Sequence, residues 1–257
     1  MKNEHLIVNG LDVRYAEQGN GKVVLLLHGW GTNLATFDTL LTEWKDQNLR
    51  FVSVDLPGFG GSEVPKEAWD VLHYAKFVRA LLDKLSIDQP YTLVGHSLGG
   101  RIAIKAVAKE ILKPEHLVLV ASAGSAKSKT ARNTIFATVA KTGKVFLSIP
   151  PLSFFKNTLR KKLYSVAGSV DYLNAGNMKD TFLKIIHENL VSDARAIKTP
   201  TLLVWGENDT ETPLNEATTL HSAINASRLK VVANAGHFVH EEQPKVVAEK
   251  IVQFTNL

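Results

Sequence analysis

Residues 91–100 have the sequence YTLVGHSLGG, and this stretch decides the fold. The apolar run at 91–95 is typical of a short buried strand, and the apolar spacing from Gly99 to Glu110 predicts an amphipathic helix. A strand that passes directly into a helix is the repeating unit of a mainly parallel sheet. The turn between them, Gly95-His96-Ser97-Leu98-Gly99, matches the pattern G-x-S-x-G.

Ser97 is the candidate nucleophile in this turn. At the tip of a sharp strand-to-helix turn a serine is exposed and strained, and side chains at either end of the turn would clash. Gly95 and Gly99 remove those side chains. The turn also aims the unpaired N–H groups at the start of the helix toward any negative charge that develops there. The alternative is an ordinary serine in a glycine-rich turn, and the position between strand and helix favours the nucleophile.

Outside this stretch, short apolar runs alternate with longer amphipathic segments, which predicts an α/β fold with a mainly parallel, twisted sheet of about eight strands flanked by helices. Asn9-Gly10 is a strong turn signal and predicts that the first two strands form an antiparallel hairpin. We expect strands at Leu6–Val8, Leu11–Ala16, Val23–His28, Arg50–Asp55, Tyr91–Gly95, His116–Ala121, Thr201–Trp205 and Arg228–Val232. We expect helices at Val71–Leu85, Gly99–Glu110, Pro213–Ile224 and Pro244–Phe254.

The segment 123–190 breaks this alternation, because no strand fits clearly within it. It predicts helices near Lys127–Lys141, Lys156–Ser165 and Met178–Leu190, and it holds seven of the twenty aromatic residues of the chain. The sheet pattern resumes at Thr199-Pro200. We therefore expect a core domain made of residues 1–122 and 191–257, with a helical cap, or lid, inserted at 123–190.

Length and composition restrict the class of protein. A chain of 257 residues can form one α/β domain with an insertion, and 45% apolar with 21% charged residues is typical of a globular protein. The absence of cysteine excludes disulfides, thiol catalysis and cysteine-ligated metals. We expect no cofactor and no metal. Neither a signal peptide nor an apolar run of about 20 residues is found, so we expect no membrane-spanning segment and a cytoplasmic location.

The net charge of +5 is unevenly distributed. Residues 124–190 carry eleven Lys and Arg against three acidic residues, a balance of +8, so the remainder carries −3. Such a segment is compatible with nucleic acid, an anionic membrane surface or acidic substrates. The simpler interpretation is that these lysines lie on the solvated faces of surface helices. No nucleic-acid motif accompanies them, so we expect no nucleic-acid partner, while peripheral membrane contact through the basic cap stays open.

A serine hydroxyl needs a base to take its proton and a third group to orient that base. His237 is the preferred base, because it lies in the loop between the last predicted strand and the last predicted helix. In mainly parallel sheets the loops that follow the carboxyl ends of the parallel strands carry the functional residues. We expect His96 to point away from the site and His28 to be a structural hydrogen-bonding group. We expect surface, lid or structural positions for His5, His73, His116, His187 and His221.

Asp209 is the preferred acid, in the loop after the strand Thr201–Trp205. Glu207 and Glu211 are its rivals in the same loop. Asp209 has a shorter side chain than Glu207 and lies further out on the loop. The strand before the insertion is followed by Ser122-Ala123-Gly124 and offers no carboxylate.

The predicted strand Val23–His28 leads into Gly29-Trp30-Gly31, where glycines let the backbone approach a substrate. The backbone N–H groups of Trp30 and Leu98 can then face one point. Two such preorganised donors would stabilise a tetrahedral oxyanion, each contributing a factor of order 10²–10³ in rate. Alternatively, the Trp30 side chain is a core aromatic. The two interpretations are compatible, because the oxyanion role uses only the backbone N–H of Trp30.

Five landmarks in order resemble those of the α/β-hydrolase superfamily, and the resemblance covers nearly the whole chain. They are His28-Gly29-Trp30-Gly31, Asp55-Leu56-Pro57-Gly58-Phe59-Gly60-Gly61-Ser62, Gly95-His96-Ser97-Leu98-Gly99-Gly100, Gly206-Glu207-Asn208-Asp209 and Gly236-His237-Phe238. The resemblance implies the α/β-hydrolase fold, a triad of Ser97, Asp209 and His237, and a helical cap that corresponds to the insertion. Asp55 and Ser62 are interpreted as structural.

The fold hosts many functions, so the substrate depends on the site. Ser97 argues against the members that use an aspartate nucleophile, the haloalkane dehalogenases and the epoxide hydrolases. The Gly-Trp-Gly loop and the cap resemble those of carboxylesterases, which implies a serine hydrolase acting on small-molecule carboxylic esters of small to medium acyl chains through an acyl-enzyme. One alternative is a hydrolase of carbon–carbon bonds in ring-fission products. Such enzymes commonly carry Asn and Trp where this chain has His96 and Phe238. A perhydrolase or a ligand receptor on the same fold is the other alternative.

Overall fold

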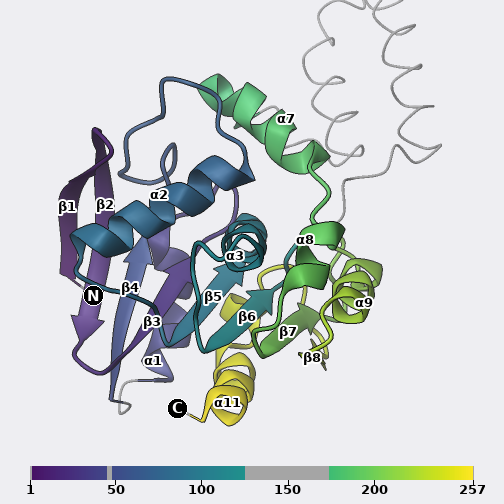
Figure 1. Cartoon of the computed structure of the whole chain (residues 1–257). Helices are drawn as coiled ribbons and strands as arrows, with labels where there is room; N and C mark the ends of the chain where they lie inside the picture. Colours follow the sequence, from purple (N-terminus) through teal and green to yellow (C-terminus); the bar gives the residue numbers. More distant parts are fainter. Residues whose placement is uncertain (1, 45–47, 125–173, 257) are drawn as a thin grey trace, which may run out of the picture.

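The computed structural model describes residues 2–44, 48–124 and 174–256, which form an eight-stranded sheet with helices on both of its faces (Figure 1). The strands are β1 (Lys2–Val8), β2 (Leu11–Gly19), β3 (Lys22–Leu27), β4 (Leu49–Val54), β5 (Thr92–His96), β6 (His116–Val120), β7 (Thr201–Gly206) and β8 (Ser227–Val232). The helices are η1 (Leu34–Phe37), α1 (Asp38–Thr42), α2 (Val71–Lys84), α3 (Leu98–Ala108), η3 (Gly176–Met178), α7 (Lys179–His187), α8 (Val191–Ala196), α9 (Leu214–Ala223), α10 (Val239–Glu242) and α11 (Pro244–Thr255).

The sheet has the order β1-β2-β4-β3-β5-β6-β7-β8. The first two strands form an antiparallel hairpin, β2 pairs antiparallel with β4, and all pairs from β4 to β8 are parallel. The predicted α/β architecture with a mainly parallel sheet of about eight strands is therefore confirmed.

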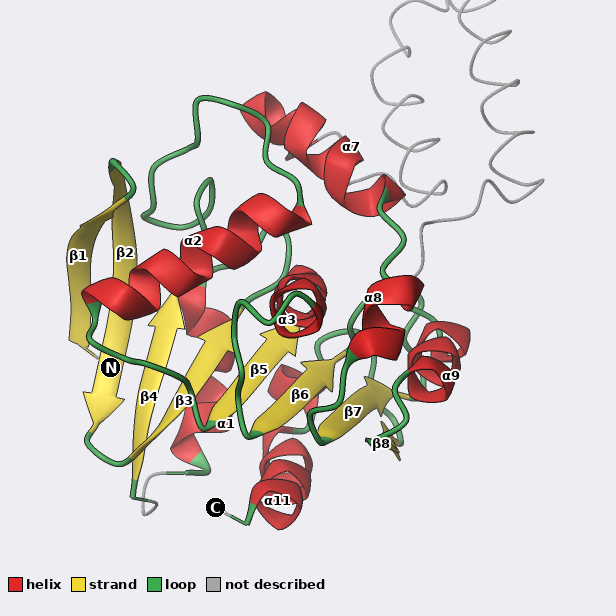
Figure 2. Ribbon diagram, viewed as in Figure 1, coloured by secondary structure: helices red, strands yellow, loops and turns green. Residues whose placement is uncertain are grey.

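Successive residues of the central strands face two separate hydrophobic cores. In β3, Leu25 and Leu27 pack into the core under α2 and α3, whereas Val24 and Leu26 pack into the core under α1 and α11. This alternation follows from the two-residue period of a strand, and it explains why β3 is continuously apolar in sequence. Figure 2 shows α2, α3, α8 and α9 over one face of the sheet and α11 over the other.

The predicted long helices match α2, α3, α9 and α11 to within a few residues. Among the described elements, the sequence analysis missed five short ones: η1, α1, η3, α8 and α10. Each has six residues or fewer, which is less than two turns, so no amphipathic period can develop in the sequence.

The division into a core and a cap at 123–190 stays a prediction, because residues 125–173 lie outside the described residues. The expected helices Lys127–Lys141 and Lys156–Ser165 fall there. The expected helix Met178–Leu190 corresponds to α7, which runs above α2 in Figure 1. None of the described helices is long and apolar enough to cross a membrane.

The connections of the sheet change direction between β3 and β5. From β3 the chain crosses to β4 on one side, and it then returns to β5 on the other side. The carboxyl ends of two strands that diverge in this way leave a crevice between their loops, which is where open α/β sheets bind ligands. The loop after β3 carries Trp30, and the turn after β5 carries Ser97.

Candidate active site

Ser97 occupies a strained turn between β5 and α3. Its backbone has φ 50° and ψ −108°, a conformation that residues with a side chain rarely adopt. Its N–H donates a hydrogen bond to the Val120 carbonyl oxygen at 3.0 Å, which fixes the turn to β6. Within the described residues the Ser97 hydroxyl makes no hydrogen bond to the protein. The expected strained and accessible serine is therefore present.

The glycines on either side of this turn allow close backbone packing. A Cβ atom at Gly99 would lie 2.0 Å from the Leu27 carbonyl oxygen, and one at Gly95 would lie 2.5 Å from backbone atoms of Gly99. Real Cβ contacts are never this short, so a side chain at either position would displace β3 or α3. The packing of the turn thus requires both glycines of the G-x-S-x-G pattern.

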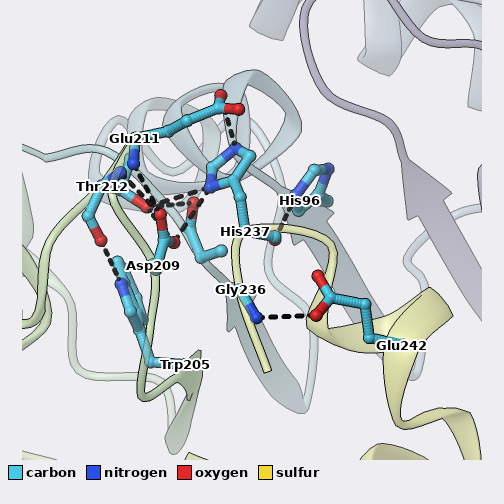
Figure 3. A network of polar contacts seen from close by, with 9 residues as sticks. His96, Trp205, Asp209, Glu211, Thr212, Gly236, His237 and Glu242 are labelled. Carbon is cyan, nitrogen blue, oxygen red and sulfur yellow. Dashed lines mark hydrogen bonds and ion pairs between the residues drawn. The ribbon is translucent and has the colours of Figure 1, made fainter. Parts of the chain in front are cut away.

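His237 and Asp209 lie in direct contact, as the sequence predicted. The Nδ1 atom of His237 lies 2.9 Å from Oδ2 of Asp209, and both side chains are almost fully buried (Figure 3). Because a carboxylate can only accept, Nδ1 of His237 carries the proton in this arrangement. The other ring nitrogen, Nε2, is then able to accept a proton.

Thr212 completes the environment of Asp209, and the sequence analysis missed it. Its hydroxyl donates to Oδ2 of Asp209 at 2.7 Å and lies 3.3 Å from Nδ1 of His237. Oδ1 of Asp209 accepts the N–H groups of Glu211 and Thr212, both at 2.9 Å. Burial alone would raise the pKa of Asp209, but the hydrogen bonds from His237 and Thr212 outweigh it and lower that pKa. A local signal could have identified Thr212. An aspartate whose side chain accepts the N–H groups two and three residues later forms a recognisable turn, which fixes the third residue beside the carboxylate.

Further hydrogen bonds hold both loops to the scaffold. The indole N–H of Trp205 in β7 donates to the Thr212 carbonyl oxygen at 2.6 Å. The N–H of Gly236 donates to Oε2 of Glu242 in α10 at 2.8 Å, which fixes the residue before His237 (Figure 3). Such support around a functional side chain keeps its geometry fixed.

One pocket brings the predicted site residues together. Ser97, His237, Trp30 and Leu98 all line it. In the described part of the chain, neither the Trp30 N–H nor the Leu98 N–H donates a hydrogen bond to the protein. The indole of Trp30 packs edge-on against Phe59 and Phe182, with ring centroids 4.9 Å apart in each pair, so it also forms part of the wall. Ser97 and His237 thus share a pocket with two unused backbone donors.

His96 lies directly behind His237. Its Nε2 donates to the His237 carbonyl oxygen at 3.1 Å, and its ring lies 4.8 Å from the His237 ring and 4.5 Å from that of His240. Burial, then the neighbouring His240 and His237, lower the pKa of His96 well below its ordinary value. As expected, His96 points away from the pocket. Its contact with the His237 backbone was not foreseen.

Two further histidines are buried in the neutral form. The ring of His28 accepts the Leu56 N–H at 2.9 Å and lies 2.7 Å from the Gly29 carbonyl oxygen, in agreement with the structural role predicted for it. Burial lowers the pKa of His28 to about 4 and that of His240 to about 3. Both groups must therefore gain a proton when the protein unfolds in mild acid.

We expect the free energy of unfolding to fall steeply between about pH 7 and about pH 5. The unfolded pKa of a histidine is 6.5, and the folded values of His28, His96 and His240 are lower. The stabilisation is therefore complete above 6.5 and is lost as pH falls toward the folded values. Each histidine contributes about 1.4 kcal/mol per pH unit below 6.5, so the three together remove about 6 kcal/mol by about pH 5. Urea unfolding at several pH values measures this slope.

A matched pair of variants tests whether buried histidines cause the slope of the free energy of unfolding against pH. His240→Gln should reduce it by about one third. His187→Gln replaces an exposed histidine at the end of α7 and is the matched control, for which we expect the wild-type slope. A wild-type curve that is flat between these pH values would contradict the prediction.

Asp55 and Ser62 hold the loop that contains Trp30. Asp55 is fully buried and accepts hydrogen bonds from Nε of Arg14 at 2.6 Å and from the Leu34 N–H at 2.8 Å. The Ser62 hydroxyl donates to the Asp55 carbonyl oxygen at 2.6 Å. Neither residue lines the pocket, which agrees with the structural role predicted for both.

Arg101 connects α3 to the segment after β6 and to the end of α7. Its guanidinium donates to the carbonyl oxygens of Ala123 at 3.3 Å, Ile185 at 2.7 Å and Glu188. Burial lowers the pKa of Arg101 to about 10, and nearby Glu188 and Glu216 oppose that shift, so the side chain is charged at neutral pH. One buried cation therefore ties Ala123, after β6, to the end of α7. The sequence analysis gave Arg101 no role.

Comparison with known proteins gives one consistent family. The family model for the alpha/beta hydrolase fold matches residues 22–244. An AB hydrolase superfamily protein of Bacillus subtilis, YisY, is 30% identical over 93% of both chains. A monoacylglycerol lipase of Mus musculus is 24% identical and covers 95% of this chain and 82% of its own. The crystal structure of a membrane phospholipase A has a TM-score of 0.78 at 21% identity, and the match covers 99% of this chain and 86% of that one.

Proposed function

The chain belongs to the α/β-hydrolase family, and from that premise we propose that it is a serine esterase, which cleaves carboxylic esters of small to medium acyl chains through an acyl-enzyme intermediate. In this proposal Ser97 is the nucleophile, His237 the base and Asp209 the residue that orients the base. The relatives with esterase or lipase names agree with this class of reaction.

One observation carries the proposal. The buried pair of Asp209 and His237, with 2.9 Å between Oδ2 and Nδ1, leaves Nε2 free to accept a proton in the pocket that also exposes Ser97. A serine in a strained turn, a histidine in the required tautomer and two unused N–H donors form a complete set for acyl transfer.

Acylation follows from these positions. Nε2 of His237 takes the proton of Ser97 as Oγ attacks the ester carbonyl carbon, and the imidazolium is stabilised by the Asp209 carboxylate. The carbonyl oxygen becomes an oxyanion, which accepts hydrogen bonds from the N–H groups of Trp30 and Leu98. The bond from carbon to the alcohol oxygen then breaks, and His237 passes the proton to the departing alcohol.

Deacylation repeats the steps with water. His237 takes a proton from water, the hydroxide attacks the acyl carbon, and the same N–H groups stabilise the second oxyanion. The bond to Ser97 Oγ breaks, and His237 returns the proton to that oxygen. The carboxylic acid leaves, and the enzyme regains its starting protonation.

The apolar part of the pocket supports an apolar acyl group. Phe182, Ile185 and Ile186 line it together with Trp30, and the first three come from α7. An apolar wall desolvates a hydrocarbon chain before attack. We propose that α7 belongs to a helical cap at 123–190 and that Phe182 limits the length of the acyl chain.

We expect Phe182→Ala to shift the preferred substrate toward longer acyl chains. Phe182 is buried and contacts Trp30 across the pocket, so its loss lengthens the apolar space. We predict that kcat/KM for short esters falls by about tenfold relative to long ones. A series of p-nitrophenyl esters from acetyl to dodecanoyl measures this. Phe254→Ala, on α11 outside the pocket, is the matched control and should leave the profile unchanged.

The same assay decides between the esterase and its alternatives. Turnover of the esters by the wild type, with little turnover of a ring-fission dienoate, supports the esterase. Efficient cleavage of the dienoate alone would assign the chain to the hydrolases of carbon–carbon bonds, and binding without turnover would assign it to the receptors. An unchanged chain-length profile in a folded Phe182→Ala protein would contradict the role of α7.

A further inference from the structure

Glu211 places a negative charge beside the proposed base. Its Oε2 atom lies 3.6 Å from Nε2 of His237, on the opposite side of the ring from Asp209 (Figure 3). Its backbone is fixed, because the Glu211 N–H donates to Oδ1 of Asp209 at 2.9 Å. The Glu211 side chain is 57% exposed, and the residue lines the same pocket as Ser97. The triad mechanism does not use this carboxylate.

The described part of the pocket holds little positive charge that could neutralise the Glu211 carboxylate. Among the described residues that line the pocket, the other permanently charged side chain is Arg101. The guanidinium of Arg101 is buried and donates to the carbonyl oxygens of Ala123, Ile185 and Glu188. Asp209 is also buried and accepts hydrogen bonds from His237 and Thr212. Within the described part of the chain, Glu211 is therefore the charged group that faces the open part of the pocket near Nε2.

The position of Glu211 identifies the part of the substrate that it meets. In ester cleavage Nε2 of His237 delivers its proton to the oxygen of the leaving alcohol, so the alcohol lies next to Nε2. In the proposed function the acyl chain lies on the side of Trp30 and Phe182. A carboxylate 3.6 Å from Nε2 is therefore close to the alcohol, and it attracts a positive charge and repels a negative one.

We propose that Glu211 is a specificity-determining residue that selects esters whose alcohol carries a cationic group, such as an amino alcohol, over esters whose alcohol is anionic. The inference rests on the proposed function and extends it to the alcohol side of the substrate. A partly exposed charge acts through a screened field, so we expect a preference of about tenfold.

Three matched butyrate esters test the proposal. Choline butyrate carries a trimethylammonium group, neohexyl butyrate replaces its nitrogen with carbon at the same shape, and a third ester has an alcohol that ends in a carboxylate. Initial rates come from the release of acid at constant pH. For the wild type we expect kcat/KM to be about tenfold higher for choline than for neohexyl butyrate, and lowest for the anionic ester.

Glu211→Gln should bring the choline and neohexyl esters to nearly equal kcat/KM and raise the value for the anionic ester. Glu207→Gln removes a carboxylate from the same loop and is the matched control. Glu207 does not line the pocket, and its Oε2 accepts the backbone N–H of Asn234 at 3.4 Å. The wild-type order of kcat/KM among the three esters should therefore persist in this variant. An equal change for all three esters in Glu211→Gln would overturn the proposal, because Glu211 would then act on His237 alone.

Binding separates this inference from the proposed function. In a Ser97→Ala background no ester is cleaved by the triad, so calorimetry measures the affinity of each intact ester. We expect choline butyrate to bind more tightly than neohexyl butyrate, and Glu211→Gln to abolish the difference. If the wild type cleaves no ester but this affinity order holds, the proposed function fails and the charge selection stands. Equal affinities for the three esters, or no binding of any, would overturn the charge selection.

Discussion

Replacing Ser97 with alanine is expected to lower kcat for esters by at least about 10⁴-fold while leaving the protein folded. In the proposed mechanism the hydroxyl oxygen is the atom that attacks, and alanine has no group that could replace it. Its removal should cost little stability, because within the described residues the hydroxyl makes no hydrogen bond to the protein. The rate, the circular dichroism spectrum and the melting temperature are measured on the same preparation.

A second serine provides the contrasting control for this variant. The Ser62 hydroxyl donates to the Asp55 carbonyl oxygen at 2.6 Å and accepts the Arg14 N–H at 2.9 Å. Ser62→Ala should therefore lower the melting temperature and retain the activity of the molecules that stay folded. Ester turnover near the wild-type level in Ser97→Ala would rule out Ser97 as the nucleophile.

The Asp209→Asn variant is expected to lower kcat by about 10³- to 10⁴-fold. An amide nitrogen beside Nδ1 of His237 favours the tautomer with the proton on Nε2, which cannot accept from Ser97. The remaining amide oxygen still accepts the N–H groups of Glu211 and Thr212, so the loop should keep its shape. KM should change little, because Asp209 is buried and does not line the pocket.

Glu207→Gln is the matched control for this second variant. Glu207 lies two residues earlier in the same loop and was one of the two rivals, with Glu211, for the role of the acid. Its loss should change kcat by less than about threefold, since its exposed side chain has no contact with His237. Comparable losses in the two variants would leave the acid unassigned.

The sequence predicted the sheet well because its strands have strong and simple signals. After Lys22, β3 is a continuous apolar run, β5 is a short buried strand that ends at a glycine-rich turn, and Asn9-Gly10 specified the first hairpin. Short helices such as α8 and α10 were missed because a segment of six residues or fewer has no measurable period. They form because the ends of the neighbouring strands bring them onto the core, which is tertiary information.

The three candidate triad residues could be predicted, because their chemistry and their positions after strands distinguish them in the sequence. Ser97, Asp209 and His237 each follow the carboxyl end of a strand, and the structure brings Asp209 and His237 into contact and Ser97 into their pocket. The residues around them were not predictable in this way. Arg101 and Glu211 owe their positions to side-chain directions and loop geometry, which sequence spacing does not encode.

Covalent labelling with a serine-directed phosphonate tests the assignment of Ser97 as nucleophile most directly. The intact mass of the treated protein gives the number of adducts, and peptide mapping gives their position. We predict a single adduct on Ser97, loss of ester turnover in proportion to labelling, and no adduct on Ser97→Ala or on folded His237→Ala. An adduct on another residue, or full activity after complete labelling of Ser97, would contradict the proposed mechanism.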